Sequence, residues 1–158
     1  MSTKVKYSFL IIAALILIAG IVFLCWLHVD GDRLPLPEGS GITGYATRIL
    51  IGLDETDHTP THDTISFDMT DTQVAEFLQL LRQNSYWRTR HGSSVSFDGD
   101  VWYTVTLAYQ AGSKQEFTMI SVLDNEMINI LVGSDTSSGY LKITDPDFLA
   151  KLQAILET

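Results

Sequence analysis

The feature that most constrains this chain is an uninterrupted apolar stretch, residues 9–27, which contains no charged side chain. As a helix rising ~1.5 Å per residue, it is long enough to span roughly 30 Å, the thickness of the hydrocarbon core of a bilayer. A helix on the surface of a soluble domain keeps a polar face, and this stretch offers none. We therefore predict a transmembrane helix at residues 9–28, with Trp26 and His28 at the membrane interface.

The charges that flank the stretch predict its orientation. Lys4 and Lys6 precede it, whereas Arg33 is the basic residue that follows most closely. Basic residues beside a span are retained in the cytoplasm, so residues 1–8 should form a short cytoplasmic tail. We therefore expect a single-pass protein of the cell membrane, with its N-terminus in the cytoplasm and its C-terminal domain extracytoplasmic.

A cleaved signal peptide and a lipoprotein signal are the two competing interpretations of this stretch. A signal peptide has an apolar core of about 7–15 residues, with small residues at the cleavage site behind it. Here the apolar run is longer and ends in LCWLH, with bulky residues in those positions. A lipoprotein signal has a small residue before the acylated cysteine, whereas Leu24 precedes Cys25. Both comparisons favour an uncleaved signal anchor.

Charge and cysteine content narrow the choice of partner. All nineteen acidic residues follow the stretch, together with eight of the ten Lys and Arg residues. This acidity makes nucleic acid a poor partner and disfavours binding flat on an anionic lipid surface. Proteins, peptides and cell-wall ligands are the expected partners. Cys25 is the only cysteine, so the domain must fold without an internal disulfide.

The rest of the chain predicts a linker and one α+β domain. Residues 29–41 combine Pro, Gly and charged residues, which is typical of a semi-rigid linker. Residues 42–158 form the extracytoplasmic domain, whose β-branched and alternating segments predict strands at 42–51, 64–69, 86–90, 101–109, 115–123, 127–132 and 140–144. Residues 53–63 between the first two strands are expected to form an acidic loop.

Two helices are predicted within this domain. The first begins after Thr70, which forms a capping box with Gln73, and its apolar stripe consists of Val74, Phe77, Leu78 and Leu81. The second follows Asp145 as the N-cap and Pro146 in the first turn. The order of elements predicts an α+β fold: a mainly antiparallel sheet with two helices packed on one face.

Three segments together carry a resemblance to a known group of proteins. They are the apolar stretch with its LPLPE linker, TISFDMTDTQVAEFLQLLRQN, and GYLKITDPDFLAKLQAIL near the C-terminus. In this pattern the chain resembles a poorly characterised group of Gram-positive bacterial single-pass membrane proteins with a small extracytoplasmic α+β domain. The resemblance implies a fold and a location, and it implies no catalytic residues.

The acidic loop is the candidate metal site. Asp54, Asp57, His58, His62 and Asp63 supply the imidazole and carboxylate groups that bind metal ions. His58 and His62 have the spacing of a helical zinc site, but Pro60 between them disfavours a helix. A solvated acidic loop without metal is the alternative.

An aromatic and basic group is the candidate ligand surface. Its members are Tyr86, Trp87, Arg88, Arg90 and Trp102. Arginine binds carboxylates through two parallel hydrogen bonds, and aromatic rings stack on sugars or peptides. The alternative is that the rings pack in the core while the arginines offset nearby acidic residues.

No pattern in the sequence is typical of an enzyme or of a cofactor site. There is no nucleophile-elbow motif, and no Gly-rich phosphate loop follows a predicted strand. We therefore predict a non-enzymatic, membrane-anchored binding domain that needs no cofactor. The alternative is a metal-dependent hydrolase or metal-responsive sensor that uses His58 and His62.

Overall fold

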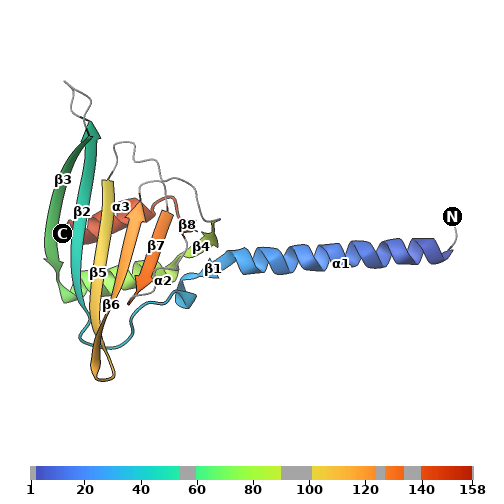
Figure 1. Ribbon diagram of the computed structural model, residues 1–158, viewed down its shortest axis with the longest axis horizontal. Helices are drawn as coiled ribbons and strands as arrows, with labels where there is room; N and C mark the ends of the chain where they lie inside the picture. Colours follow the sequence, from blue (N-terminus) through green and yellow to red (C-terminus); the bar gives the residue numbers. More distant parts are fainter. Residues whose placement is uncertain (1–2, 54–59, 90–100, 124–126, 134–139, 158) are drawn as a thin grey trace.

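The chain consists of a long helix followed by an α+β domain (Figure 1). The computed structural model describes residues 3–53, 60–89, 101–123, 127–133 and 140–157. The described elements are, in order, α1 (Thr3–Leu27), β1 (His28–Asp30), the 3-10 turn η1 (Gly31–Arg33), β2 (Thr43–Leu53), β3 (Pro60–Met69), α2 (Asp71–Gln83), β4 (Ser85–Arg88), β5 (Val101–Ala111), β6 (Lys114–Leu123), β7 (Met127–Val132), β8 (Leu141–Ile143) and α3 (Phe148–Leu156).

The described strands form one antiparallel sheet in the order β1-β4-β8-β7-β6-β5-β2-β3. This confirms the predicted α+β class and the antiparallel sheet. β5, β6 and β7 pair in sequence as a meander, as their alternating residues indicated. The turn between β5 and β6 begins with Gly112, whose φ of 67° suits the first position of a two-residue hairpin turn.

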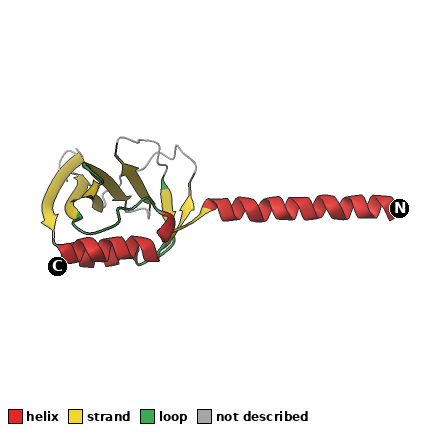
Figure 2. Ribbon diagram, turned by 90° about the horizontal axis from the view of Figure 1, so that it is seen from below, coloured by secondary structure: helices red, strands yellow, loops and turns green. Residues whose placement is uncertain are grey.

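Helices α2 and α3 cover one face of the sheet and close the hydrophobic core (Figure 2). The predicted stripe of α2 is buried in this core, as are alternate residues of the central strands such as Val105, Leu107 and Ile120. The predicted capping box is also present. The Thr70 hydroxyl accepts a hydrogen bond from the Gln73 amide at 3.2 Å, and the Gln73 side chain accepts one from the Thr70 amide at 2.9 Å.

The opposite face of the sheet, here called the outer face, carries exposed apolar side chains. Tyr45, Phe117 and Met119 are 45%, 49% and 37% exposed. The register aligns Tyr45 with Thr106 of β5, and Thr106 with Met119 of β6. These larger side chains therefore flank the smaller residues Thr106 and Ala108 of β5.

The start of α3 differs from the prediction. α3 begins at Phe148, and its N-cap is Asp147, which makes no side-chain capping bond. The Asp145 carboxylate instead accepts hydrogen bonds from the Asp147 amide and from Lys151. Asp145 therefore fixes the turn before the helix rather than the first helical turn.

The segment predicted as a linker is part of the domain. β1 pairs with β4 at the edge of the sheet, and Val29 lies in the core. Gly31, Leu34 and Pro37 are also buried. The Gly31 amide donates to the Asn84 carbonyl at 2.8 Å, which ties η1 to the end of α2. The prolines and glycines suggested a spacer, but the segment that contains them packs against the domain.

A helix is present where the apolar stretch lies, because α1 extends from Thr3 to Leu27. Its large apolar side chains between Ile11 and Trp26 are 53–68% exposed. Four of them occupy consecutive positions, 15–18, so they point to all sides of the helix. In the part of the chain that the structure describes, no helix is long and apolar enough to cross a membrane. The membrane span therefore stays a prediction.

We expect Gly31→Ala to destabilise the domain strongly. A Cβ atom at this position would lie 2.5 Å from the Arg82 carbonyl oxygen and 2.7 Å from its carbonyl carbon, and it would also meet the Leu81 carbonyl. These are backbone atoms that cannot rotate away, so a loss of ~1–3 kcal/mol in the free energy of unfolding is expected. Urea unfolding measures it. Gly20→Ala, which meets no atom within 4 Å, is the control and should not destabilise the chain.

Candidate functional site

The predicted aromatic and basic cluster is not brought together by the fold. Its described members come from β4 and β5, and three strands, β8, β7 and β6, lie between these two in the sheet. Trp102 pairs with Ile49 through the backbone, far from Trp87, and its side chain, like Arg90, lies outside the described residues. Strands from later in the sequence insert between β4 and β5, which a linear interpretation of the sequence does not anticipate.

Tyr86 is a core residue rather than part of a ligand surface. Its side chain is fully buried, and its hydroxyl donates to the Leu81 carbonyl at 2.8 Å. Burial raises the pKa of Tyr86 well above its ordinary value, so the hydroxyl stays neutral. The alternative interpretation, in which the ring packs in the core, is the one that holds for this residue.

The predicted metal loop is shorter than expected. β2 continues to Leu53 and β3 begins at Pro60, so His62 and Asp63 lie in a strand, opposite Ile51 and Leu50. Proline fits the first position of an edge strand because its missing N–H faces solvent there. Asp54, Asp57 and His58 lie outside the described residues. Among the residues that are described, no three potential ligands gather into a metal site.

A different group of aromatic and charged residues meets where α1 enters the domain. The His28 and Trp87 rings, on paired positions of β1 and β4, pack edge to face with centroids 5.3 Å apart. The Arg88 guanidinium carbon lies 5.5 Å from the centre of the Trp26 ring, a cation–π distance. We call Trp26, His28, Arg33, Trp87 and Arg88 the junction site.

Two carboxylates of the described chain lie in this region: Asp32 is exposed in η1, and Asp30 contacts two of the basic side chains. One oxygen of its carboxylate lies 3.2 Å from His28 Nε2, and the other lies 3.6 Å from Arg33 Nε. In the described part of the chain, Arg88 has no such ion pair and contacts the Trp26 ring instead. Counting the described residues alone, the positive charge of Arg33 is therefore partly offset by a carboxylate and that of Arg88 is not.

A small cavity adjoins the junction site. It has a volume of about 170 Å³, with Val29, Leu34, Ile130 and Leu141 among its apolar walls and Arg33 and Arg88 as its charged residues. A larger hollow of about 380 Å³ lies between α2 and the segment 37–42. There Arg82 donates to the Pro37 carbonyl at 3.1 Å, so its guanidinium already serves to hold that segment.

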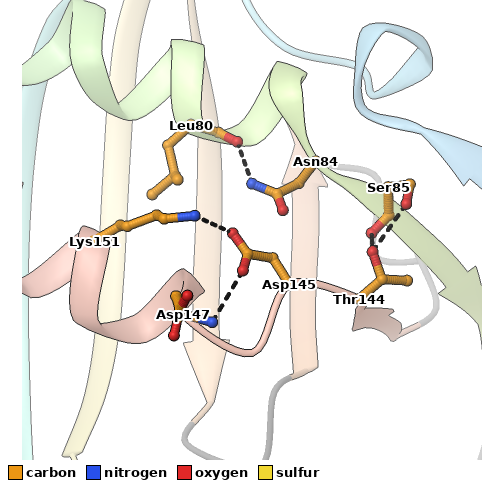
Figure 3. Close-up of polar contacts among 7 residues, drawn as sticks. All are labelled: Leu80, Asn84, Ser85, Thr144, Asp145, Asp147 and Lys151. Atoms are coloured by element: carbon orange, nitrogen blue, oxygen red, sulfur yellow. Dashed lines mark hydrogen bonds and ion pairs between the residues drawn. The ribbon is translucent and has the colours of Figure 1, made fainter.

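A second polar cluster lies at the corner between β8 and α3 (Figure 3). Lys151 Nζ lies 2.6 Å from one Asp145 oxygen, and the Asp147 amide donates to the other at 3.0 Å. The hydrogen bond from Lys151 holds the pKa of Asp145 below its ordinary value, and the Asp147 amide adds to this effect. The same contact raises the pKa of Lys151.

Two neighbouring side chains in Figure 3 form hydrogen bonds to backbone carbonyl groups of the domain. The Asn84 side chain donates to the Leu80 carbonyl at 2.8 Å, which satisfies an acceptor at the end of α2. The Thr144 hydroxyl donates to the Ser85 carbonyl, also at 2.8 Å. This cluster therefore stabilises two corners of the domain. The junction site is the stronger candidate for function.

Comparisons with protein-family models, curated proteins and solved structures found no match. The resemblance to Gram-positive single-pass membrane proteins therefore stays a prediction. Sequence reasoning placed Trp26 and His28 at an interface and selected Trp87 and Arg88 as ligand residues, but it did not join the two pairs. The two pairs meet because β1 pairs with β4. This pairing could not be predicted, because His28–Asp30 is too short to be recognised as a strand in the sequence.

We expect Asp145→Asn to remove a stabilising contact that depends on pH. A carboxyl group whose folded-state pKa is depressed stabilises the fold above its unfolded pKa, ~3.9 for Asp, and this contribution is lost as the pH falls through the folded value. The variant should therefore be less stable than the parent at pH 7, and the difference should shrink toward pH 2–3. The effect should be small because Lys151 is largely exposed.

Urea midpoints of both proteins, measured from pH 7 downward, test this expectation. Asp68→Asn, an exposed substitution on β3, is the control. A difference between Asp145→Asn and the parent that stays constant down to pH 2 would contradict the proposed contact.

Proposed function

We propose that this chain is a single-pass membrane protein that holds a non-enzymatic interaction domain on the extracytoplasmic side of the cell membrane. The observation that carries the proposal is the exposed apolar surface of α1 on all its sides. Each Leu, Ile or Phe side chain gains ~1.5–3 kcal/mol on transfer from water to an apolar environment. Lipid supplies such an environment for a helix that the domain does not cover.

The connection between α1 and the domain supports a position directly at the membrane surface. α1 ends at Leu27 and β1 begins at His28, so no spacer separates the helix from the sheet. Trp26, His28 and Trp87 lie at this connection. Amphipathic rings of this kind are typical of the boundary between lipid and water.

The outer face of the sheet supports the binding part of the proposal. Tyr, Phe and Met are enriched in the cores of protein interfaces, and Tyr45, Phe117 and Met119 are exposed on this face. Asp68 lies opposite Tyr45 in the register and is exposed beside it. We therefore propose a protein partner with an apolar contact surface and basic residues at its rim, matching the net charge of −9.

Protease treatment of protoplasts tests the orientation. We expect protease added outside to remove residues 30–158 and to leave a small membrane-bound fragment, because the positive charge before α1 keeps the N-terminus inside. Lysed protoplasts are the control and should show the same loss of residues 30–158. Protection of the whole chain in sealed cells, with digestion only after lysis, would reverse the orientation and place the domain in the cytoplasm.

A photo-reactive benzoylphenylalanine side chain tests the outer face. Placed at Phe117 in the full chain, it should form a covalent adduct with a protein partner in intact cells. The same side chain at Ile65 is the matched control, because Ile65 is 48% exposed but lies beside Arg48 on the face that the helices cover. Adding Tyr45→Ser should weaken the adduct formed at position 117. Equal adducts at both positions, or none at position 117, would contradict this binding face.

A further inference from the structure

We infer that the cavity of the junction site binds the phosphate headgroup of a membrane phospholipid. This inference rests on the proposed function, because it requires α1 to lie in a membrane. It adds a ligand class and a site to that proposal, and it assigns a role to Arg33 and Arg88 that the fold alone does not require.

The cavity lies close to the end of α1. β1 follows α1 directly, and at ~3.3 Å per residue three strand residues extend only about 10 Å. The headgroup regions add ~10–15 Å in total to a hydrocarbon core of ~30 Å, so they lie immediately beyond the end of a spanning helix. The cavity walls include Val29 of β1 and residues just behind it. A spanning α1 therefore places the cavity at the level of the lipid phosphates.

The cavity combines two guanidinium groups with apolar walls. The guanidinium group matches phosphate oxygens through paired hydrogen bonds, and Arg33 and Arg88 both line the cavity. Arg88 is exposed and lies over the Trp26 ring at the end of α1, and the Arg33 side chain is 76% exposed, so neither side chain is enclosed by the domain. The apolar walls suit the glycerol and first methylene groups of a lipid better than they suit a free phosphate ion.

The two arginines differ in the groups that they contact within the protein. The Asp30 carboxylate contacts both His28 and Arg33, so the positive charge of Arg33 is partly offset. Arg88 contacts an aromatic face, which orients the guanidinium and leaves its charge in place. Arg88 should therefore contribute more to phosphate binding than Arg33.

Native mass spectrometry of the full chain in a neutral detergent, titrated with phosphatidylglycerol, tests the inference. Each positive charge near an anionic lipid surface contributes ~1 kcal/mol, which is about fivefold in affinity. We expect Arg88→Gln to weaken lipid binding about fivefold, and Arg33→Gln combined with Arg88→Gln to weaken it further. Lys114→Gln is the matched control, because it removes one positive charge at the far β5–β6 turn and should change affinity less than twofold.

Two further measurements separate the possible outcomes. Inorganic phosphate at the concentration of the lipid should not displace it, and displacement would overturn the assignment to a lipid. Equal affinities of the parent, Arg88→Gln and Lys114→Gln would overturn the site. Carbonate extraction of cells that express the parent tests the anchor separately. Recovery in the soluble fraction refutes both proposals, whereas membrane retention with equal lipid affinities refutes only the headgroup site.

Discussion

The pairing of β1 with β4 is the interaction on which the relation between helix and domain depends. His28, Val29 and Asp30 lie opposite Trp87, Tyr86 and Ser85. Val29 and Tyr86 are both buried, so packing in the core also holds β1 against β4. The next residue, Gly31, sits so close to the end of α2 that no side chain fits. Together these contacts set the direction in which α1 leaves the domain.

The far end of the domain is held by a different set of contacts. Glu157, just after α3, accepts hydrogen bonds from Arg48 of β2 at 2.8 Å and from Tyr103 of β5 at 3.1 Å. Burial raises the pKa of Tyr103, and the bond to Glu157 adds to this shift, so Tyr103 acts as a neutral donor. α3 is thereby attached to the sheet at its C-terminal end. At the other end of α3, Asp145 and Lys151 brace the turn that leads into it.

Local patterns predicted most of the elements, whereas the relations between distant elements could not be predicted. The stripe of α2 and its Thr70 cap depend on residues three or four positions apart, so they were predicted correctly. The strands of the meander were also predicted, because the alternation of apolar and polar residues along β5 and β6 indicates strands with one buried face. The place of β4 beside β1 and β8 depends on segments that are far apart in the sequence. For the same reason Arg88 was grouped with Trp102 rather than with Trp26.

The net charge of the whole sequence is a poor guide to the charge near the end of α1. The overall acidity suggested repulsion from anionic lipid, yet the sheet places β1 and β3 at opposite edges (Figure 1). The eight described strands have seven spacings of ~4.8 Å, so roughly 34 Å along the sheet separate those edges. At physiological ionic strength the Debye length is ~8 Å, so exposed acidic residues on β3, such as Asp63 and Asp68, are screened from the end of α1. In the proposed location, a lipid surface would respond instead to the charges beside α1, which include Asp30 and Asp32 as well as the two arginines of the junction site. Among the described residues, Asp30 is the only carboxylate within ion-pair distance of either arginine.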